Sequence, residues 1–275
     1  MTDADASVVA SRSRPVGSPL WLAVVSGLGV GLLGGLVGLG GAEFRLPLLI
    51  GLFGFAALQA VIVNKAMSLI VVLVAIPSRL LAVPLADVAS EWTVVINLLV
   101  GSLVGAWIGA SWATRMRAAT LYRVLAILLV GIAVVFAAEH VGALPPVSLP
   151  PIAQAIVGVA AGFGIGVVAA IMGVAGGELL IPTITVLYDV SPKLAGSLSL
   201  LVSLPTMLVA FFRYSRDQAF TVLGQHPRFI LAMAAGSILG TFLGALLLGV
   251  VSEAVLVPLI VGLLLVSAYK VWRHA

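Results

Sequence analysis

The chain has 275 residues, of which 62% are hydrophobic and 9% are charged, and its formal net charge is +4. A soluble domain carries roughly 25% charged residues, so this chain has too few charges to cover a water-facing surface. With a mean hydropathy of +1.26, it has the composition of a polytopic membrane protein. The basic residues are scattered over short connectors between apolar runs, which argues against a nucleic-acid partner. There is no cysteine, which excludes disulfides and thiol chemistry.

Apolar runs dominate the chain after residue 18. Residues 1–18 are polar, and we expect them to form a disordered cytoplasmic tail. Eight runs are long enough to cross a bilayer, which takes about 20 helical residues. They cover residues 20–42, 60–82, 92–113, 119–138, 152–175, 194–212, 228–250 and 254–272. Two shorter segments, 44–57 and 179–190, follow glycine clusters. The sequence therefore predicts an all-α polytopic membrane protein with about ten transmembrane segments, eight full and two short or broken.

The distribution of positive charge favours ten crossings of the cytoplasmic membrane, with both termini in the cytoplasm. If the two short segments cross, most arginines and lysines outside the spans lie on the cytoplasmic side, as membrane proteins prefer. Only Arg79 and Lys193 then lie outside. If both segments are re-entrant, the arginine-rich connectors after residues 113 and 212 fall on opposite sides. Four tryptophans also occupy span ends, as interface anchors do; they are Trp21, Trp92, Trp112 and Trp272.

An internal repeat appears when the sequence is shifted by 135 residues. The shift matches Gly41, Glu43 and Pro47 with Gly176, Glu178 and Pro182, and it matches the glycines of GSLVGAWIG with those of GSILGTFLG. We expect two transmembrane repeats, 19–142 and 152–275, joined by a Pro-rich connector, 143–151. Because each repeat has five crossings, an odd number, the second repeat would be inverted relative to the first, as in many secondary transporters.

Each repeat contains a glycine–proline break, GLGGAEFRLP in the first and GVAGGELLIP in the second. Glycine weakens a helix and proline interrupts it, so we expect unwinding around residues 38–47 and 173–182. The N–H groups of the restarted helices, with Gly40, Gly41, Gly176 and Gly177, are candidates to bind an anion. Glu43 and Glu178 have two alternative roles, as first-turn acids that stabilise these helices or as proton carriers.

Polar side chains around the breaks are the other candidates for substrate binding. Arg45 has no counterpart in the second repeat; it either pairs with Glu43 or contacts an anion. Asn64, Lys65 and Ser68 follow on the next span, where Lys65 either snorkels to the interface or needs an anionic partner. Ser199 and Ser203 occupy the equivalent face of the second repeat. Arg79 and Arg213 end their spans, either as interface anchors or as residues that attract anions to the two mouths.

Other patterns predict packing or exclude chemistry. The glycines of GSLVGAWIG and GSILGTFLG have the small-xxx-small spacing that lets membrane helices approach closely. GVGLLG lies inside an apolar run without a preceding strand, so it does not indicate a dinucleotide site. His140, His226 and His274 lie outside the spans and form no metal motif. We expect no metal, no cofactor, no catalytic residue and no enzymatic activity.

The doubled motif G-x-[GA]-G-x-E-[FL]-x-[LI]-P, each copy after a glycine-rich span, resembles that of the sulfite exporter TauE/SafE family, also called the toluene sulfonate uptake permease family. The resemblance covers residues 20 to 272. It implies transport of small anions such as sulfite, organosulfonates or other sulfur compounds. Many family motifs have a third glycine or an apolar residue where this chain has Ala42, Glu43 and Arg45.

We therefore expect a secondary transporter that moves a small anion by alternating access between two repeats, with proton coupling through Glu43 or Glu178. The partners would be the anion and the lipid bilayer, and homo-oligomerisation stays open. The alternatives are a channel, a transporter of a cation or neutral solute, and a membrane scaffold or assembly factor without transport activity.

Overall fold

The computed structural model describes residues 19–37, 41–82, 84–140, 142, 145–247 and 253–275, and within these ranges the ordered elements are helices. The predicted disordered tail, residues 1–18, lies outside the described residues. In chain order the elements are α2 (Leu20–Val37), α3 (Ala42–Gly51), α4 (Ala57–Ala82), α5 (Leu85–Ser90), α6 (Trp92–Arg115), α7 (Ala118–His140), α8 (Pro151–Met172), α9 (Gly177–Tyr188), α10 (Pro192–Tyr214), η1 (Gln218–Thr221), α11 (Val222–Gln225), α12 (Pro227–Leu246) and α13 (Glu253–Trp272).

Each apolar run predicted from the sequence corresponds to a helix. Among the described residues, seven helices are long and apolar enough to cross a membrane, namely α4, α6, α7, α8, α10, α12 and α13. Leu20–Leu36 and Gly177–Tyr188 are shorter apolar stretches, and α3 has only 10 residues. The four tryptophans lie near helix ends, as the sequence predicted, and are 49% to 63% exposed.

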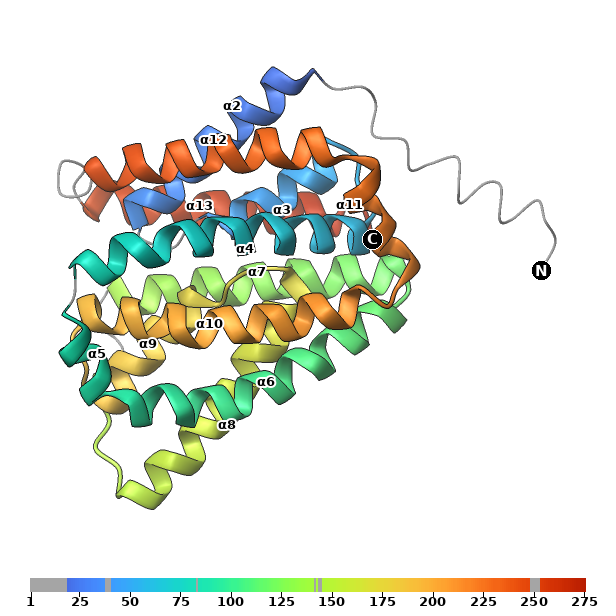
Figure 1. The fold of residues 1–275 in the computed structure, drawn as a ribbon. Helices are drawn as coiled ribbons and strands as arrows, with labels where there is room; N and C mark the ends of the chain where they lie inside the picture. Colours follow the sequence, from blue (N-terminus) through green and yellow to red (C-terminus); the bar gives the residue numbers. More distant parts are fainter. Residues whose placement is uncertain (1–18, 38–40, 83, 141, 143–144, 248–252) are drawn as a thin grey trace.

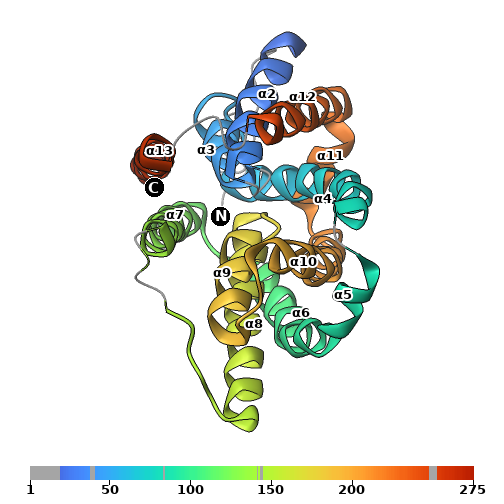
Figure 2. The same ribbon diagram turned by 90° about the vertical axis from the view of Figure 1, so that its left-hand side faces the viewer.

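The long helices form a bundle in which most axes are nearly parallel (Figure 1). Viewed from one end, α2, α3, α4 and α12 gather in one group, and α6, α8, α9 and α10 gather in another (Figure 2). The paired helices α7 and α13 stand beside both groups. Each group therefore contains three helices from one half of the chain and one from the other half. The link between α6 and α7, the segment from α10 to α12 and the C-terminus lie at one end of the bundle (Figure 1).

Each group contains one helix pair that packs through glycines, and these two pairs confirm the small-xxx-small prediction. A Cβ at Gly101, Gly105 or Gly109 of α6 would collide with backbone carbonyls of α8. In the same way, α12 packs against α2 through Gly236, Gly240 and Gly244. The facing helices contribute glycines of their own, such as Gly162 and Gly27, so the two backbones touch along several turns.

The breaks are shorter than the sequence predicted. We expected unwinding up to Pro47 and Pro182, but α3 begins at Ala42 and α9 at Gly177, so both prolines lie inside helices. Each proline is the sixth residue of its helix, where it removes a single backbone hydrogen bond, the one that the carbonyl four residues earlier would have accepted. The helix continues because the rest of its ladder is intact. Those two freed carbonyls belong to Glu43 and Glu178.

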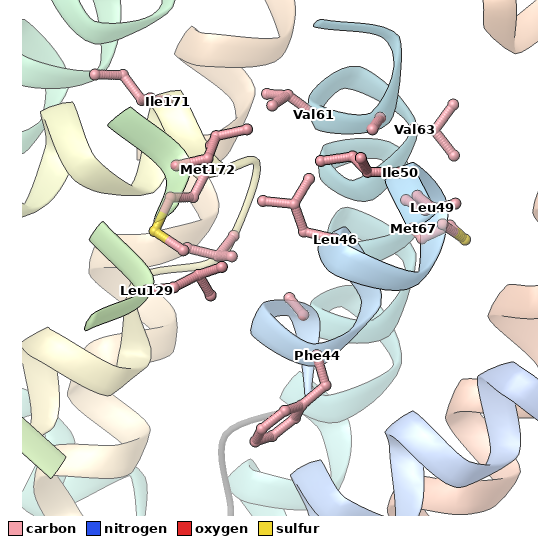
Figure 3. Packing of buried hydrophobic residues seen from close by; sticks show 14 of the residues in the cluster. Phe44, Leu46, Leu49, Ile50, Val61, Val63, Met67, Leu129, Ile171 and Met172 are labelled. Atoms are coloured by element: carbon pink, nitrogen blue, oxygen red, sulfur yellow. The ribbon is translucent and has the colours of Figure 1, made fainter. Parts of the chain in front are cut away.

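Helix α3 is buried on most sides, which is unusual for so short a segment. Leu46 and Leu49 are 0% exposed. Leu46 points toward Met172 at the end of α8, while Leu49 lies near Met67 of α4 on the other side (Figure 3). The apolar packing fixes α3 between α4 and the second break, and this places its polar residues in the protein interior.

Candidate functional site

The two glutamates of the repeated motif come together in the interior. Glu43 and Glu178 occupy the first turns of α3 and α9, and they are 2% and 6% exposed. Each helix starts after a glycine in the left-handed conformation, Gly41 with φ 72° and Gly176 with φ 89°, where a side chain is strained. The two carboxyl groups lie close enough to interact directly. The structure is consistent with both alternatives for these glutamates. Their position at helix N-termini suits acids that stabilise the first turn, and their proximity in the interior suits proton carriers.

Arg45 is fully buried beside this pair. Its Nη1 lies 3.4 Å from Asn64 Oδ1 and 3.4 Å from Ser68 Oγ, both on α4. Among the described residues, its Nε and Nη2 have no hydrogen-bond partner. Arg45 also interacts electrostatically with Glu43. A buried guanidinium with unsatisfied donors is costly, and the planar fork of Arg45 is suited to bind an acceptor with two oxygens.

Asn64 and Ser68 attach α4 to both breaks. The Asn64 amide donates to the carbonyl of Ala42, 3.1 Å away at the start of α3, and to that of Met172, 3.2 Å away at the end of α8. Ser68 Oγ lies 3.4 Å from the Gly173 carbonyl. Breaks that are far apart in the sequence therefore meet on one face of α4.

Lys65 lies on the same helix and is 0% exposed. Its ammonium donates to the Ala169 carbonyl at 2.8 Å and to the Val174 carbonyl at 2.6 Å. It does not snorkel, because its donors are directed at the last turn of α8. An ammonium has three N–H donors, so these two bonds leave one for another acceptor. Lys65 also interacts electrostatically with Glu178.

The remaining predicted residues are distributed unevenly. Ser199 donates to the Gly196 carbonyl of its own helix, 2.9 Å away, while the buried Ser203 hydroxyl has no partner within the described ranges. Gly177 is the first residue of α9, and Gly40 lies outside the described residues. Arg213 does not lie in the cluster, because its guanidinium donates to Ser111 and Thr114 of α6. Arg79 belongs to α4, and its side chain lies outside the described part of the chain.

The charged cluster of Glu43, Arg45, Lys65 and Glu178 is balanced when all four groups are ionised, with two positive and two negative charges. Burial makes each of these charges expensive unless it is paired. Protonation of one carboxyl group would leave the cluster with a net positive charge. A small anion could then compensate it and accept bonds from Arg45 and Lys65. The arrangement can therefore link proton binding to anion binding through electrostatics alone.

Sequence reasoning missed Tyr214 and the carbonyl groups at the second break. Tyr214 is 0% exposed and its hydroxyl donates to the Ala170 carbonyl at 2.9 Å. Together with Lys65 it adds side-chain donors at the C-terminal end of α8, where the carbonyls of Ala169 and Ala170 also accept from backbone N–H groups. In the sequence it follows Arg213 at the end of a span, and only the fold brings it under the break.

The chain was compared with known proteins. The family model described as sulfite exporter TauE/SafE matches residues 6–136 and 146–275. The search of curated proteins and the search of solved structures found no match. The match covers both halves, including both breaks with their buried glutamates. The chain belongs to the sulfite exporter TauE/SafE family of membrane transport proteins.

Proposed function

We propose that the protein is a secondary transporter of a small anion, such as sulfite or an organosulfonate, and that the anion binds between the two breaks. The observation that carries this proposal is Arg45, which is fully buried beside a pair of buried carboxyl groups and has two guanidinium nitrogens without a partner in the part of the chain that the structure describes. Arg45, Asn64, Lys65 and Ser68 supply donors from the first repeat. The hydroxyl groups of Ser199 and Ser203 and the N–H groups after Gly40, Gly41, Gly176 and Gly177 complete the set.

Proton coupling is part of this proposal. The titratable or charged groups around the site are Glu43 and Arg45 on α3, Lys65 on α4, Glu178 on α9 and Tyr214 on α10. An anion enters more favourably once Glu43 or Glu178 has taken a proton, because the cluster is then positive. By linkage, the bound anion favours protonation to the same extent. The anion and the proton therefore move together.

The transport cycle would rock one repeat against the other. We infer that residues 19–142 and 152–275 form two inverted five-segment repeats, because a helix of each repeat packs on the other repeat in the same way. Helix α2 packs on α12 and α8 packs on α6, and these pairs correspond under the 135-residue shift. Alternating access around a site between broken helices is a common use of such symmetry.

The basic end of the bundle would face the cytoplasm, and the protein would lie in the cytoplasmic membrane. The end that holds the C-terminus carries most of the basic residues, including Arg115, Arg117, Arg228 and Arg273 (Figure 1). Acidic residues such as Asp87, Glu91 and Asp189 lie at the other end. This asymmetry matches the preference of cytoplasmic loops for positive charge.

Uptake by reconstituted liposomes tests the proposal. Vesicles that contain the purified protein should accumulate sulfite or a sulfonate when an inward proton gradient is imposed, and they should show counterflow when preloaded. Glu43→Gln/Glu178→Gln vesicles should lose the response to the proton gradient. Flux that never saturates and shows no counterflow would indicate a channel. Flux of none of the tested anions under any gradient would refute anion transport and favour a scaffold.

A further inference from the structure

Two grooves on the flanks of the molecule correspond to each other under the 135-residue shift. The α13 groove, about 800 Å³, lies between α2, α3 and α13, and the α7 groove, about 540 Å³, lies between α7, α8 and α9. Most lining positions match, for example Gly29 with Gly164 and Pro47 with Pro182. Both grooves are mainly apolar, but they differ in what closes them.

The α7 groove is covered by the chain itself. Val147 and Leu149 of the connector line it, and the Val147 N–H donates to the Val186 carbonyl of α9 at 2.9 Å. An extended, apolar stretch of chain therefore lies along this groove. The same shift places Arg12 and Arg14 at the corresponding positions before α2. Two arginines are poor substitutes for apolar residues in a groove whose rim is already basic.

The rim of the α13 groove is basic at the C-terminal end of α13. Lys270, Arg273 and His274 line this end and are exposed. The matching positions of Lys270 and Arg273 are Val135 and Ala138. The same groove is lined by the apolar side chains of Leu33, Phe44 and Leu48, which form its floor. An apolar groove with a cationic end is complementary to an amphipathic anion whose charge lies at one end.

We propose that the α13 groove binds an anionic phospholipid, with one acyl chain along its apolar floor and the phosphate at Lys270 and Arg273. The lipid takes the place that Val147 and Leu149 occupy in the α7 groove. Basic pockets between membrane helices are suited to anionic headgroups, and the acyl chain supplies an apolar contact like that of Val147 and Leu149 in the α7 groove. The site is separate from the buried cluster and does not depend on the transported substrate.

Native mass spectrometry of the detergent-purified full chain tests this site with phosphatidylglycerol against phosphatidylcholine. We expect phosphatidylglycerol to bind roughly thirtyfold more tightly, the factor that two basic contacts provide. Lys270→Ala/Arg273→Ala should remove most of this preference. The charge-matched control, Lys193→Ala/Arg228→Ala, changes two exposed residues that do not line the groove and should preserve it. Equal loss in both double variants would overturn the site, because attraction would then be general.

Three further measurements separate the occupants. Gly29→Leu should fill the groove and reduce lipid binding, while Gly164→Leu should not; a Cβ at either glycine meets nothing within 4 Å, so both variants should fold. Millimolar inorganic phosphate should not displace the lipid; displacement would indicate a phosphate site without an acyl chain. Removal of residues 1–18 should leave lipid binding unchanged. If the truncated chain binds lipid and the full chain does not, the tail itself occupies the groove, which would refute the proposal.

Discussion

Arg45 combines complete burial with unused donors. Two of its three guanidinium nitrogens lack partners in the described part of the chain, whereas Asn64 and Ser68 lie within reach of the third. A side chain that served only to pair with Glu43 would be expected to use its donors fully, because unsatisfied buried donors cost about 1–3 kcal/mol each. The free donors of Arg45 therefore favour an acceptor group that belongs to the proposed substrate.

Replacing Arg45 should weaken anion binding more than it weakens folding. Arg45→Lys keeps the charge but loses the planar fork, and we expect sulfite affinity to fall by about tenfold, the effect of one charge-assisted bond of about 1.5 kcal/mol. Binding by calorimetry measures this, with Arg228→Lys at the exposed start of α12 as the control. Unchanged affinity in Arg45→Lys would exclude a directional contact between this side chain and the anion.

The glutamate pair should give anion binding a defined pH dependence. Because protonation makes the cluster positive, affinity should increase as the pH falls, by up to about tenfold per pH unit for one linked proton. Glu43→Gln/Glu178→Gln should flatten this dependence. Titration of sulfite binding between pH 5 and about 8 in wild type and variant gives the slope. An equal slope in both proteins would place the linked proton elsewhere, for example on the anion itself.

At the scale of elements, the contacts of Lys65 couple α4 to the end of α8. The ammonium bonds to Ala169 and Val174, and the position that corresponds to Lys65 in the second repeat is Leu200. The structural and ligand roles of Lys65 predict different outcomes for a neutral side chain of similar length. The glycine pairs α2–α12 and α6–α8 are the other elements on which the architecture depends.

Lys65→Met should destabilise the fold, because it removes the Lys65 donor from the buried Val174 carbonyl, at a cost of about 1–3 kcal/mol. The Ala169 carbonyl keeps the backbone N–H of Val174 as a donor. The thermal midpoint of the detergent-purified protein without anion should therefore decrease. Leu200→Met at the corresponding position is the control and should change the midpoint little. If Lys65→Met instead keeps its thermal midpoint and loses only sulfite binding, the lysine binds the anion and does not stabilise the fold.

Gly105→Leu should separate α6 from α8, since a Cβ at this position already collides with the Phe163 carbonyl. Overpacking costs about 1–3 kcal/mol even where side chains can move, and a backbone obstacle cannot move aside. We expect a reduced yield of folded protein in size-exclusion chromatography. Gly131→Leu on α7 is the matched control, because its added Cβ meets nothing within 4 Å. Equal behaviour of the two variants would contradict close backbone packing of α6 on α8.

At the scale of the whole molecule, each group of helices includes one helix from the other half of the chain (Figure 2). This exchange means that neither half encloses a core independently. Relative motion of the two groups would change the surroundings of the buried cluster, which lies where both breaks meet α4.

The proposed inversion of the repeats can be measured by labelling. Since the chain has no cysteine, single cysteines at Thr93 and Arg228, which are 135 residues apart, report on corresponding ends of α6 and α12. With an impermeant maleimide on sealed vesicles, Thr93→Cys and Arg228→Cys should be modified from opposite sides. Modification of both from the same side would show that the repeats are parallel, and the alternating-access scheme would fail.

The sequence alone determined the class of the protein, its helical runs and its repeat. A composition this apolar cannot fold in water, helix length follows from bilayer thickness, and paired glycines, glutamates and prolines are visible without coordinates. Tertiary structure decided which donors are free. The sequence could not show that Lys65 binds carbonyls of the other half, that Tyr214 lies beneath the break, or that Pro47 and Pro182 stay within helices. The first two outcomes depend on contacts between residues more than 40 positions apart. The third depends on tertiary packing, which stabilises a short helix that its own sequence would not hold.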